Sequence, residues 1–256
     1  MSTGQHTHAD RQADLDTLEE EAARLGLALD ASARRRFARY LELLEAWRDR
    51  AGLTSLTDPV AVQRRHFGES LALLVALRAS GALPAGEPVD VVDVGSGAGF
   101  PGVPMLILDP GLRLTLVESH GRRARFLETL VDELDLDGVR VITARAEESG
   151  RDPTCRERFD VAVARALAPL PVLVEYLLPL LRRGGIMAAP KGSSAQRELR
   201  EAGAAVEALG GCPAESVPLS LPEGSRPQQV VIVRRCEALP DRFPRRPGIP
   251  AKRPLS

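Results

Sequence analysis

The sequence predicts an α/β fold: a doubly wound, mostly parallel sheet with an antiparallel edge hairpin and an N-terminal helical extension. Two observations lead to this prediction. After Pro88, short β-branched runs alternate with helical stretches, an order that places parallel strands side by side with helices on both faces. Before Pro88, apolar residues recur at helical spacing. With 256 residues and 44% hydrophobic content, the chain can bury a substantial core.

Three helices are predicted in the N-terminal region. The first lies within 14–27, where Gly26 closes the apolar pattern. The second follows Asp30, a good N-cap residue, and its apolar stripe belongs in the core. That stripe consists of Phe37, Tyr40, Leu41, Leu44 and Trp47. The third starts at Pro59, which suits the first turn of a helix, and runs to about Ser80.

Six β-branched runs are predicted as strands. They cover 89–94, 112–117, 139–143, 159–164, 184–190 and 228–233. The helices between them are expected near 101–108, 122–134, 170–181 and 194–209. A turn-rich loop without a helix joins the segment 212–219 to the last strand. These two segments should therefore pair as an antiparallel hairpin at the edge of the sheet.

The two ends of the chain differ in charge, although the net charge is only -1. Residues 1–30 hold seven acidic residues and two arginines, whereas residues 234–256 hold seven basic and two acidic residues. Such asymmetry is typical of proteins that contact a polyanion, but arginine is frequent throughout this chain. Composition alone therefore leaves nucleic-acid binding open.

Membrane, redox and metal functions are not indicated. The sequence has no apolar run of the about 18 residues that a membrane helix needs, and no basic-then-apolar leader. We therefore expect a soluble, cytoplasmic protein without membrane contact. The three cysteines are far apart in the sequence and form no CxxC pair, so we expect reduced, inert thiols and no metal site.

The run VVDVGSGAGFPG (91–102) ends the first predicted strand in a glycine cluster. In an open parallel sheet, ligands bind beyond the carboxyl ends of the strands, where the strand order reverses. Gly95, Gly97 and Gly99 can adopt positive φ and let the backbone approach a ligand closely. Pro101 suits the first turn of the next helix. This cluster is therefore a candidate cofactor site.

Two carboxylates flank the glycine cluster. Glu118 ends the next strand, where an acid can accept both hydroxyls of a ribose. Asp93 suits a positively charged ligand such as S-adenosylmethionine, which carries a sulfonium and an ammonium group. Gly97, Gly99 and Gly102 also fit G-x-G-x-x-G, the dinucleotide pattern, and a simple tight turn is a third interpretation. An adenosine-containing cofactor is favoured, and its identity stays open at this point.

Several motifs together resemble the RsmG family, also called glucose-inhibited division protein B. They are DVGSGAGFPGVP (93–104), VESHGRRARFL (117–127), RAEE (145–148), FDVAVARALAPL (159–170), Lys191-Gly192 and FPRRPGIPAKRPL (243–255). The likeness runs from about Leu15 to the C-terminus. It implies a Rossmann-like methyltransferase sheet that binds S-adenosyl-L-methionine. It also implies methylation of N7 of a guanine in 16S rRNA, as RNA alone or in the small-subunit particle.

The resemblance also implies roles for single residues. It places Gly95 and Phe100 against the cofactor, Ala146 and Glu147 near the adenine, and Arg165 facing the site. With the residues derived above, the predicted cofactor-binding set is Asp93, Gly95, Gly97, Gly99, Phe100, Glu118, Ala146, Glu147 and Arg165. The chain departs from the family pattern at GLTS (52–55), where NLTS is common, and at Glu69, where the pattern R-H-x-x-D-S has Asp. The roles of Thr54 and His66 therefore stay open.

The implied chemistry needs no catalytic base, because N7 of guanine carries a lone pair and no proton. Positioning should dominate the rate. Arg165 and Lys191 are the predicted catalytic residues, acting by binding guanine O6 or a phosphate. The predicted RNA-binding residues are Arg122, Arg123, Arg125, Lys191, Arg245, Arg246, Lys252 and Arg253.

Four regions follow from these patterns. They are a disordered N-terminus (1–12), a helical cap (13–82), an S-adenosylmethionine-binding methyltransferase domain (88–236) and a basic Pro-rich tail (237–256). Two other functions stay open on the sequence alone. One is an NAD-dependent oxidoreductase, and the other is a non-catalytic RNA-binding assembly factor.

Overall fold

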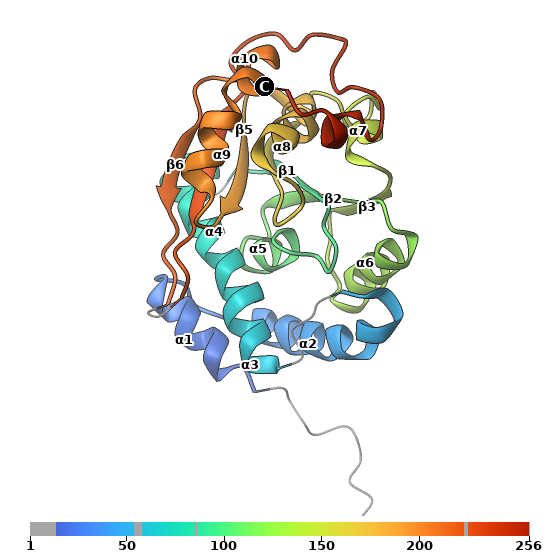
Figure 1. The fold of residues 1–256 in the computed structure, drawn as a ribbon. Coiled ribbons are helices and arrows are strands. Elements are labelled where there is room, and N and C mark those ends of the chain that lie inside the picture. Colours follow the sequence, from blue (N-terminus) through green and yellow to red (C-terminus); the bar gives the residue numbers. More distant parts are fainter. Residues whose placement is uncertain (1–13, 54–57, 85–86, 223–224, 256) are drawn as a thin grey trace, which may run out of the picture.

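The computed structural model describes residues 14–53, 58–84, 87–222 and 225–255 (Figure 1). The prediction for residues 1–12 concerns residues outside these ranges, and so does Thr54, whose role the sequence left open. None of the helices within the described ranges is both long and apolar enough to cross a membrane.

One sheet of seven strands forms the centre of the described chain, in the order β3-β2-β1-β4-β5-β7-β6. The strands are β1 (Val89–Val94), β2 (Leu112–Glu118), β3 (Val139–Thr143), β4 (Phe159–Val163), β5 (Leu181–Lys191), β6 (Glu215–Pro218) and β7 (Gln229–Arg234). Strands β1 to β5 pair in parallel, whereas β7 pairs antiparallel with both β5 and β6. The predicted fold class and the edge hairpin are confirmed. The strand order reverses between β1 and β4, which places the expected ligand site at their carboxyl ends.

Both faces of the sheet are buried, as the near-continuous apolar run of β1 predicts. Val91 packs into one core with the N-terminal helices, while its neighbour Val92 packs into a second core on the opposite face. The first core includes α5 (Gly102–Leu108) and α6 (Gly121–Glu133). The second core includes α8 (Leu170–Leu177), α9 (Ala195–Glu201) and α10 (Gly203–Ala208). Figure 1 shows blue α2 and orange α10 on opposite sides of the molecule.

The N-terminal helices pack on the first face and share its core with the strands. They are α1 (Asp16–Arg24), α2 (Ala31–Ala51), α3 (Pro59–Val62) and α4 (Glu69–Ala79). The Asp30 side chain accepts a hydrogen bond from the Ala33 amide, so the predicted N-cap is confirmed. The predicted helix 59–80 is interrupted by a π-helical segment (Gln63–Gly68) between α3 and α4. Such a segment inserts an extra residue per turn and is frequent at functional sites.

Two further predictions about helices differ from the structure. The expected helix 194–209 is divided into α9 and α10, because Gly203 is a weak helix former at the break. The short helix α7 (Ala146–Ser149) falls in a segment for which no helix was predicted. Its four residues are too few to produce an apolar period in the sequence.

The prediction of three reduced cysteines is wrong for two of them. Cys212 and Cys236 form a disulfide with a Cα–Cα distance of 5.5 Å, and Cys155 is free and buried. The partners are 24 residues apart in the sequence, which hid their proximity. The antiparallel bridge between Gly211 and Arg235 brings them side by side after α10 and β7.

The described part of the C-terminal tail (237–255) folds back over the second face. Phe243 is buried in the second core, and α11 (Ile249–Lys252) contacts α8. The tail therefore passes from the end of β7 along α8, and the Gly248 amide reaches a carboxylate of α7. The tail thereby reaches α7, which follows the carboxyl end of β3.

Candidate functional site

The glycine turn has the backbone conformation that the sequence predicts. Gly95, Gly97 and Gly99 have φ of 71°, 57° and 92°. A Cβ atom on Gly97 would meet only the Gly95 carbonyl oxygen, at 3.7 Å, so this side of the turn is open. A Cβ on Gly99 would lie 2.5 Å from the Tyr40 hydroxyl. Gly97 is therefore the position where a ligand can approach the backbone, while Gly99 is needed for packing.

Tyr40 anchors the glycine turn to α2. It is fully buried, and its hydroxyl donates a hydrogen bond to the Ala98 carbonyl oxygen at 2.5 Å. Burial and the nearby Asp93 raise the pKa of Tyr40 well above its ordinary value, so the hydroxyl stays a neutral donor.

Replacing Tyr40 with phenylalanine is expected to lower the free energy of unfolding by about 1–3 kcal/mol, because the Ala98 carbonyl loses its buried donor. The ring contacts with Phe67 and Phe100 remain in this variant, so the change isolates the hydrogen bond. Urea unfolding measures the effect. An unfolding free energy equal to that of the wild type would contradict this assignment.

Asp93 is fully buried at the end of β1. Its Oδ2 atom accepts a hydrogen bond from the Gly102 amide at 2.8 Å, which fixes the first turn of α5. Its Oδ1 atom is buried and has no hydrogen-bond partner in the described structure. Burial raises the pKa of Asp93 to about 7; the bond from Gly102 opposes this shift, and the charge of Glu118 adds to it. The site therefore contains one oxygen that a cationic or hydrogen-bonding ligand can satisfy.

Glu118 ends β2 beside the same turn. Its Oε2 atom accepts a hydrogen bond from the Gly97 amide at 2.9 Å, and its Oε1 atom accepts one from the His120 amide at 2.8 Å. The side chain is buried, so these bonds hold the carboxylate in one orientation. The predicted neighbours Asp93, Gly97 and Glu118 are thus brought together.

Arg165 follows β4 and connects the site to the N-terminal helices. Its Nη2 atom lies 2.7 Å from a carboxylate oxygen of Glu69 and 2.8 Å from the Arg65 carbonyl oxygen. Its Nη1 atom is buried without a hydrogen-bond partner in the described ranges. Burial lowers the pKa of Arg165, and Glu69 opposes that effect. The guanidinium therefore has one side bound to protein and one buried nitrogen that is not.

His66, whose role the sequence left open, lies beside Phe100 and Arg165. Its ring stacks on Phe100 with 4.7 Å between centroids, and its Nδ1 atom lies 3.2 Å from Nη2 of Arg165. Because the guanidinium can only donate, Nδ1 accepts and the ring proton is assigned to Nε2. Burial, with Arg165 and Arg65, lowers the pKa of His66 to about 4, so the ring is neutral near pH 7. A helix places His66 and Glu69, which are about one turn apart, on the same face. This spacing was the signal in the sequence that could have indicated their shared position beside Arg165.

The segment after β4 lies directly over the glycine turn. Leu167 is 38% exposed, and a Cβ atom on Gly95 would lie 2.7 Å from its Cδ1 atom. Lys191, at the end of β5, donates to the Ala168 carbonyl oxygen at 2.7 Å and pairs with Glu198 of α9 at 2.8 Å. Its ammonium thus has protein partners, and its predicted catalytic and RNA-binding roles stay predictions.

The predicted adenine-side residues are joined to the tail. Ala146 is half-buried, whereas Glu147 is buried and accepts a hydrogen bond from the Gly248 amide at 2.7 Å. Arg245 pairs with the fully buried Glu175 of α8: its Nε atom donates to Oε1 at 2.9 Å and its Nη2 atom to Oε2 at 2.6 Å, and its predicted RNA-binding role stays a prediction. Burial, followed by the charge of Glu147, raises the pKa of the neighbouring Tyr176 to about 12.

Comparisons with known proteins identify the family to which this chain belongs. A family model described as rRNA small subunit methyltransferase G, of the GidB family, matches residues 33–225. The chain belongs to this family. The relatives include the ribosomal RNA small subunit methyltransferase G of Roseiflexus sp. (strain RS-1), 44% identical over 242 residues that cover 94% of this chain and 100% of the relative. The protein of that name from Lactobacillus johnsonii is 39% identical and covers 92% of this chain and 97% of its own length.

Solved structures with low sequence identity show the fold of the family. A mutant of MtNAS has a TM-score of 0.52 and 19% identity, covering 87% of each chain. A SAM-dependent O-methyltransferase from Thermotoga maritima has a TM-score of 0.50 and 14% identity, covering 77% of this chain and 72% of that one. The predicted resemblance to RsmG and the Rossmann-like fold are confirmed.

The other residues of the predicted RNA-binding set differ in how exposed their side chains are. Arg123 donates a hydrogen bond to the Gly52 carbonyl oxygen at 3.0 Å and is half-buried. The exposed members of the predicted RNA-binding set are Arg122, Arg125, Arg246, Lys252 and Arg253. These five side chains are accessible to a large polyanion, and their binding role stays a prediction.

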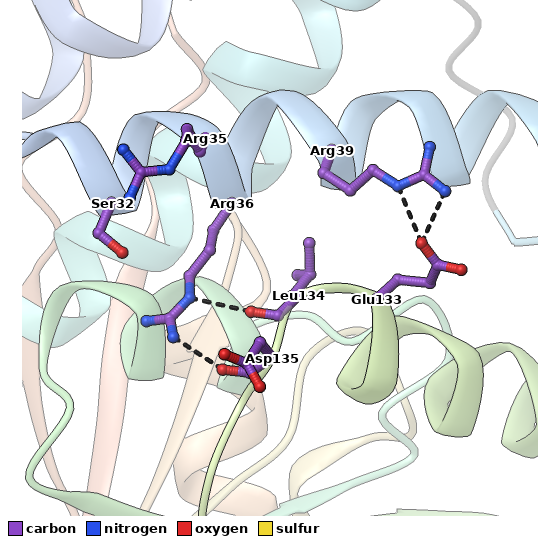
Figure 2. Close-up of a pocket in the computed structure, with 7 residues that line it drawn as sticks. All are labelled: Ser32, Arg35, Arg36, Arg39, Glu133, Leu134 and Asp135. Atoms are coloured by element: carbon purple, nitrogen blue, oxygen red, sulfur yellow. Dashed lines mark hydrogen bonds and ion pairs between the residues drawn. The ribbon is translucent and has the colours of Figure 1, made fainter.

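Two cavities lie away from the predicted site. The first cavity has a volume of about 280 Å³ and lies between α2 and the end of α6 (Figure 2). Figure 2 shows that Arg36 donates to the Leu134 and Asp135 carbonyl oxygens while Arg39 pairs with Glu133. These contacts join the N-terminal helices to the sheet.

The second cavity has a volume of about 840 Å³ and lies between α9, α10 and the start of the tail. Neither cavity is lined by a predicted site residue. Within the described ranges, no cluster of His, Cys, Asp and Glu can hold a metal ion.

Proposed function

We propose that this protein is an S-adenosylmethionine-dependent methyltransferase that methylates N7 of a guanine in 16S rRNA of the small ribosomal subunit. Family membership supports the reaction class and the rRNA substrate. The observation that carries the cofactor assignment is the open glycine turn between two buried carboxylates, Asp93 and Glu118, at the point where strand order reverses.

The residues of the turn fit S-adenosylmethionine. The open side of Gly97 leaves room for the nucleoside, and Glu118 retains lone pairs for the ribose hydroxyls beyond its two backbone bonds. The unpartnered Oδ1 atom of Asp93 favours a cationic ligand. The same buried carboxylate disfavours a dinucleotide, whose diphosphate is anionic. The oxidoreductase alternative is therefore not favoured.

The chemistry requires orientation more than proton transfer. When bound, the cofactor supplies an electrophilic methyl group on a sulfonium. Arg165 and the neutral ring of His66 line the site without offering a base, because Arg165 cannot accept a proton and the Nδ1 atom of His66 faces a donor. The guanine N7 lone pair needs no deprotonation. Holding the reacting atoms in line can contribute on the order of 7–11 kcal/mol to lowering the barrier.

The variant Gly97→Asp tests the proposed function. We expect it to fold, because its Cβ would make only an ordinary contact with the Gly95 carbonyl oxygen, at 3.7 Å, and Asp tolerates positive φ better than most residues. Its carboxylate would occupy the nucleoside side of the turn and abolish binding of S-adenosylmethionine. The measurements are calorimetric titration with the cofactor and mass mapping of 7-methylguanosine in 16S rRNA treated with each protein.

A matched control is Gly138→Asp, a second glycine at positive φ with open space around its Cβ. It precedes the amino end of β3, away from the glycine turn, and this variant is expected to methylate like the wild type. A wild-type protein that binds no S-adenosylmethionine would refute the proposed function. Equal and substantial 7-methylguanosine yields from Gly97→Asp and wild type would overturn the assignment of the glycine turn. A wild type that binds the cofactor but yields no 7-methylguanosine would instead favour a non-catalytic assembly factor.

A further inference from the structure

A buried ion pair lies behind the segment that covers the glycine turn. The Lys191 ammonium and the Glu198 carboxylate are 2.8 Å apart, and each side chain is only 11% exposed. Ser194 donates a further hydrogen bond to Glu198 at 2.7 Å, which fixes the carboxylate on α9. Both charges are thus satisfied inside the protein.

The ion pair holds the backbone on both sides of Pro169. Lys191 donates to the Ala168 carbonyl oxygen at 2.7 Å, and Glu198 accepts from the Leu170 amide at 2.8 Å. We call residues 164–169 the β4–α8 loop. Its other end is held by Arg165, which is bound to Glu69 and to the backbone of the π-helical segment.

Between these two anchors the loop is strained and partly exposed. Ala166 has φ of 52°, a conformation that residues with a side chain adopt only where the surroundings impose it. The next residue, Leu167, is a large apolar side chain that is 38% exposed and fills the space over Gly95. The anchors therefore determine where this apolar side chain lies relative to the cofactor turn.

We propose that Lys191 and Glu198 are positioning residues that fix the β4–α8 loop, so that Leu167 forms the apolar wall of the cofactor site over Gly95. Lys191 acts through the loop and not by binding an RNA phosphate. The inference rests on the proposed function for the identity of the cofactor, whereas the anchoring of the loop does not depend on it.

The alternative, an RNA contact through Lys191, makes opposite predictions for the two partners. Removing a phosphate-binding lysine weakens RNA binding and lowers its salt dependence. Removing the neighbouring glutamate frees the ammonium and strengthens RNA binding. A positioning pair behaves differently, because losing either partner releases the same loop and losing both adds little.

The experiment compares Lys191→Met, Glu198→Ala and the double variant. Glu201→Ala is the control, because Glu201 lies on the same helix in an exposed ion pair with Arg197. Hydrogen exchange of the Leu170 amide reports on the loop, and calorimetry gives the dissociation constant of S-adenosylmethionine. Filter binding of 16S rRNA at several salt concentrations gives the RNA affinity.

For each single variant we expect Leu170 exchange to accelerate and the cofactor dissociation constant to rise, each by about tenfold or more, with the double variant no worse than the weaker single variant. RNA affinity and its salt dependence stay within about twofold of the wild type. The control matches the wild type in all three measurements. Opposite changes in RNA affinity for Lys191→Met and Glu198→Ala, with unchanged Leu170 exchange, would overturn the proposal.

If a variant of Lys191 or Glu198 does not fold, Leu167→Ala provides a second test. We expect this variant to fold, because the Leu167 side chain is partly exposed. It should weaken cofactor binding while leaving Leu170 exchange unchanged. An unchanged cofactor dissociation constant in Leu167→Ala would also overturn the proposal. If the wild type binds no S-adenosylmethionine, the proposed function fails. The exchange of Leu170 in Lys191→Met, which keeps the carboxylate that accepts from this amide, still decides whether the pair holds the loop.

Discussion

Replacing Arg165 with methionine is expected to lower the free energy of unfolding by about 3–5 kcal/mol and to abolish methyl transfer. Arg165 and Glu69 are both mostly buried and 2.7 Å apart, so the variant leaves the Glu69 carboxylate without its countercharge. It also removes the buried Nη1 atom that has no partner in the described structure. Urea unfolding and incorporation of labelled methyl groups into 16S rRNA measure the two effects.

A second substitution, at Glu69, separates the effect of Arg165 on stability from its effect on activity. The double variant Arg165→Met with Glu69→Gln has no unpaired charge, so it should recover most of the lost unfolding free energy. Methyl transfer should stay absent, because the guanidinium is still missing. If the double variant methylates RNA like the wild type, Arg165 serves only to hold the N-terminal helices and its predicted role at the substrate is wrong.

The affinity for S-adenosylmethionine is expected to fall by up to about tenfold for each pH unit below 7. The pKa of Asp93 is about 7 because burial raises it, against the hydrogen bond from Gly102 and with the help of Glu118. Above this pH the carboxylate is charged and attracts the cationic cofactor. Below it the carboxyl group is neutral, so the attraction is lost as the pH falls. Calorimetric titrations across this range give the profile.

Asp93→Asn should bind the cofactor weakly at every pH, because an amide retains the acceptor for Gly102 but carries no charge. Asp90→Asn is the matched control on the same strand, where the carboxylate pairs with Arg113 away from the glycine turn. It should keep the wild-type profile. A pH profile of Asp93→Asn that matches the wild type would show that another group titrates.

Much of the fold follows from local patterns in the sequence. The β-branched runs around Val91 and Val92 predict buried parallel strands, and the glycine turn between Asp93 and Glu118 follows from strand order. These predictions succeed because each depends on the backbone preferences of neighbouring residues. The edge hairpin succeeds for the same reason, since a short turn-rich loop leaves few other ways to pair β6 with β7.

The contacts across the site could not be predicted in this way. His66 stacks on Phe100, and Lys191 pairs with Glu198 through a helix packed beside the strand end. Such partners are chosen by tertiary packing, which a single sequence does not display. The Cys212–Cys236 disulfide was missed for the same reason. Exposure also depends on packing, so the pattern that marked Arg245 as an RNA contact could not reveal its buried carboxylate partner.

The C-terminal tail supplies hydrogen-bond donors to two carboxylates that lie much earlier in the sequence. Arg245 neutralises Glu175, and the Gly248 amide caps Glu147 beside the strand ends. Both acids therefore depend on the tail: without it, the fully buried Glu175 would lose its countercharge and Glu147 would lose its backbone donor.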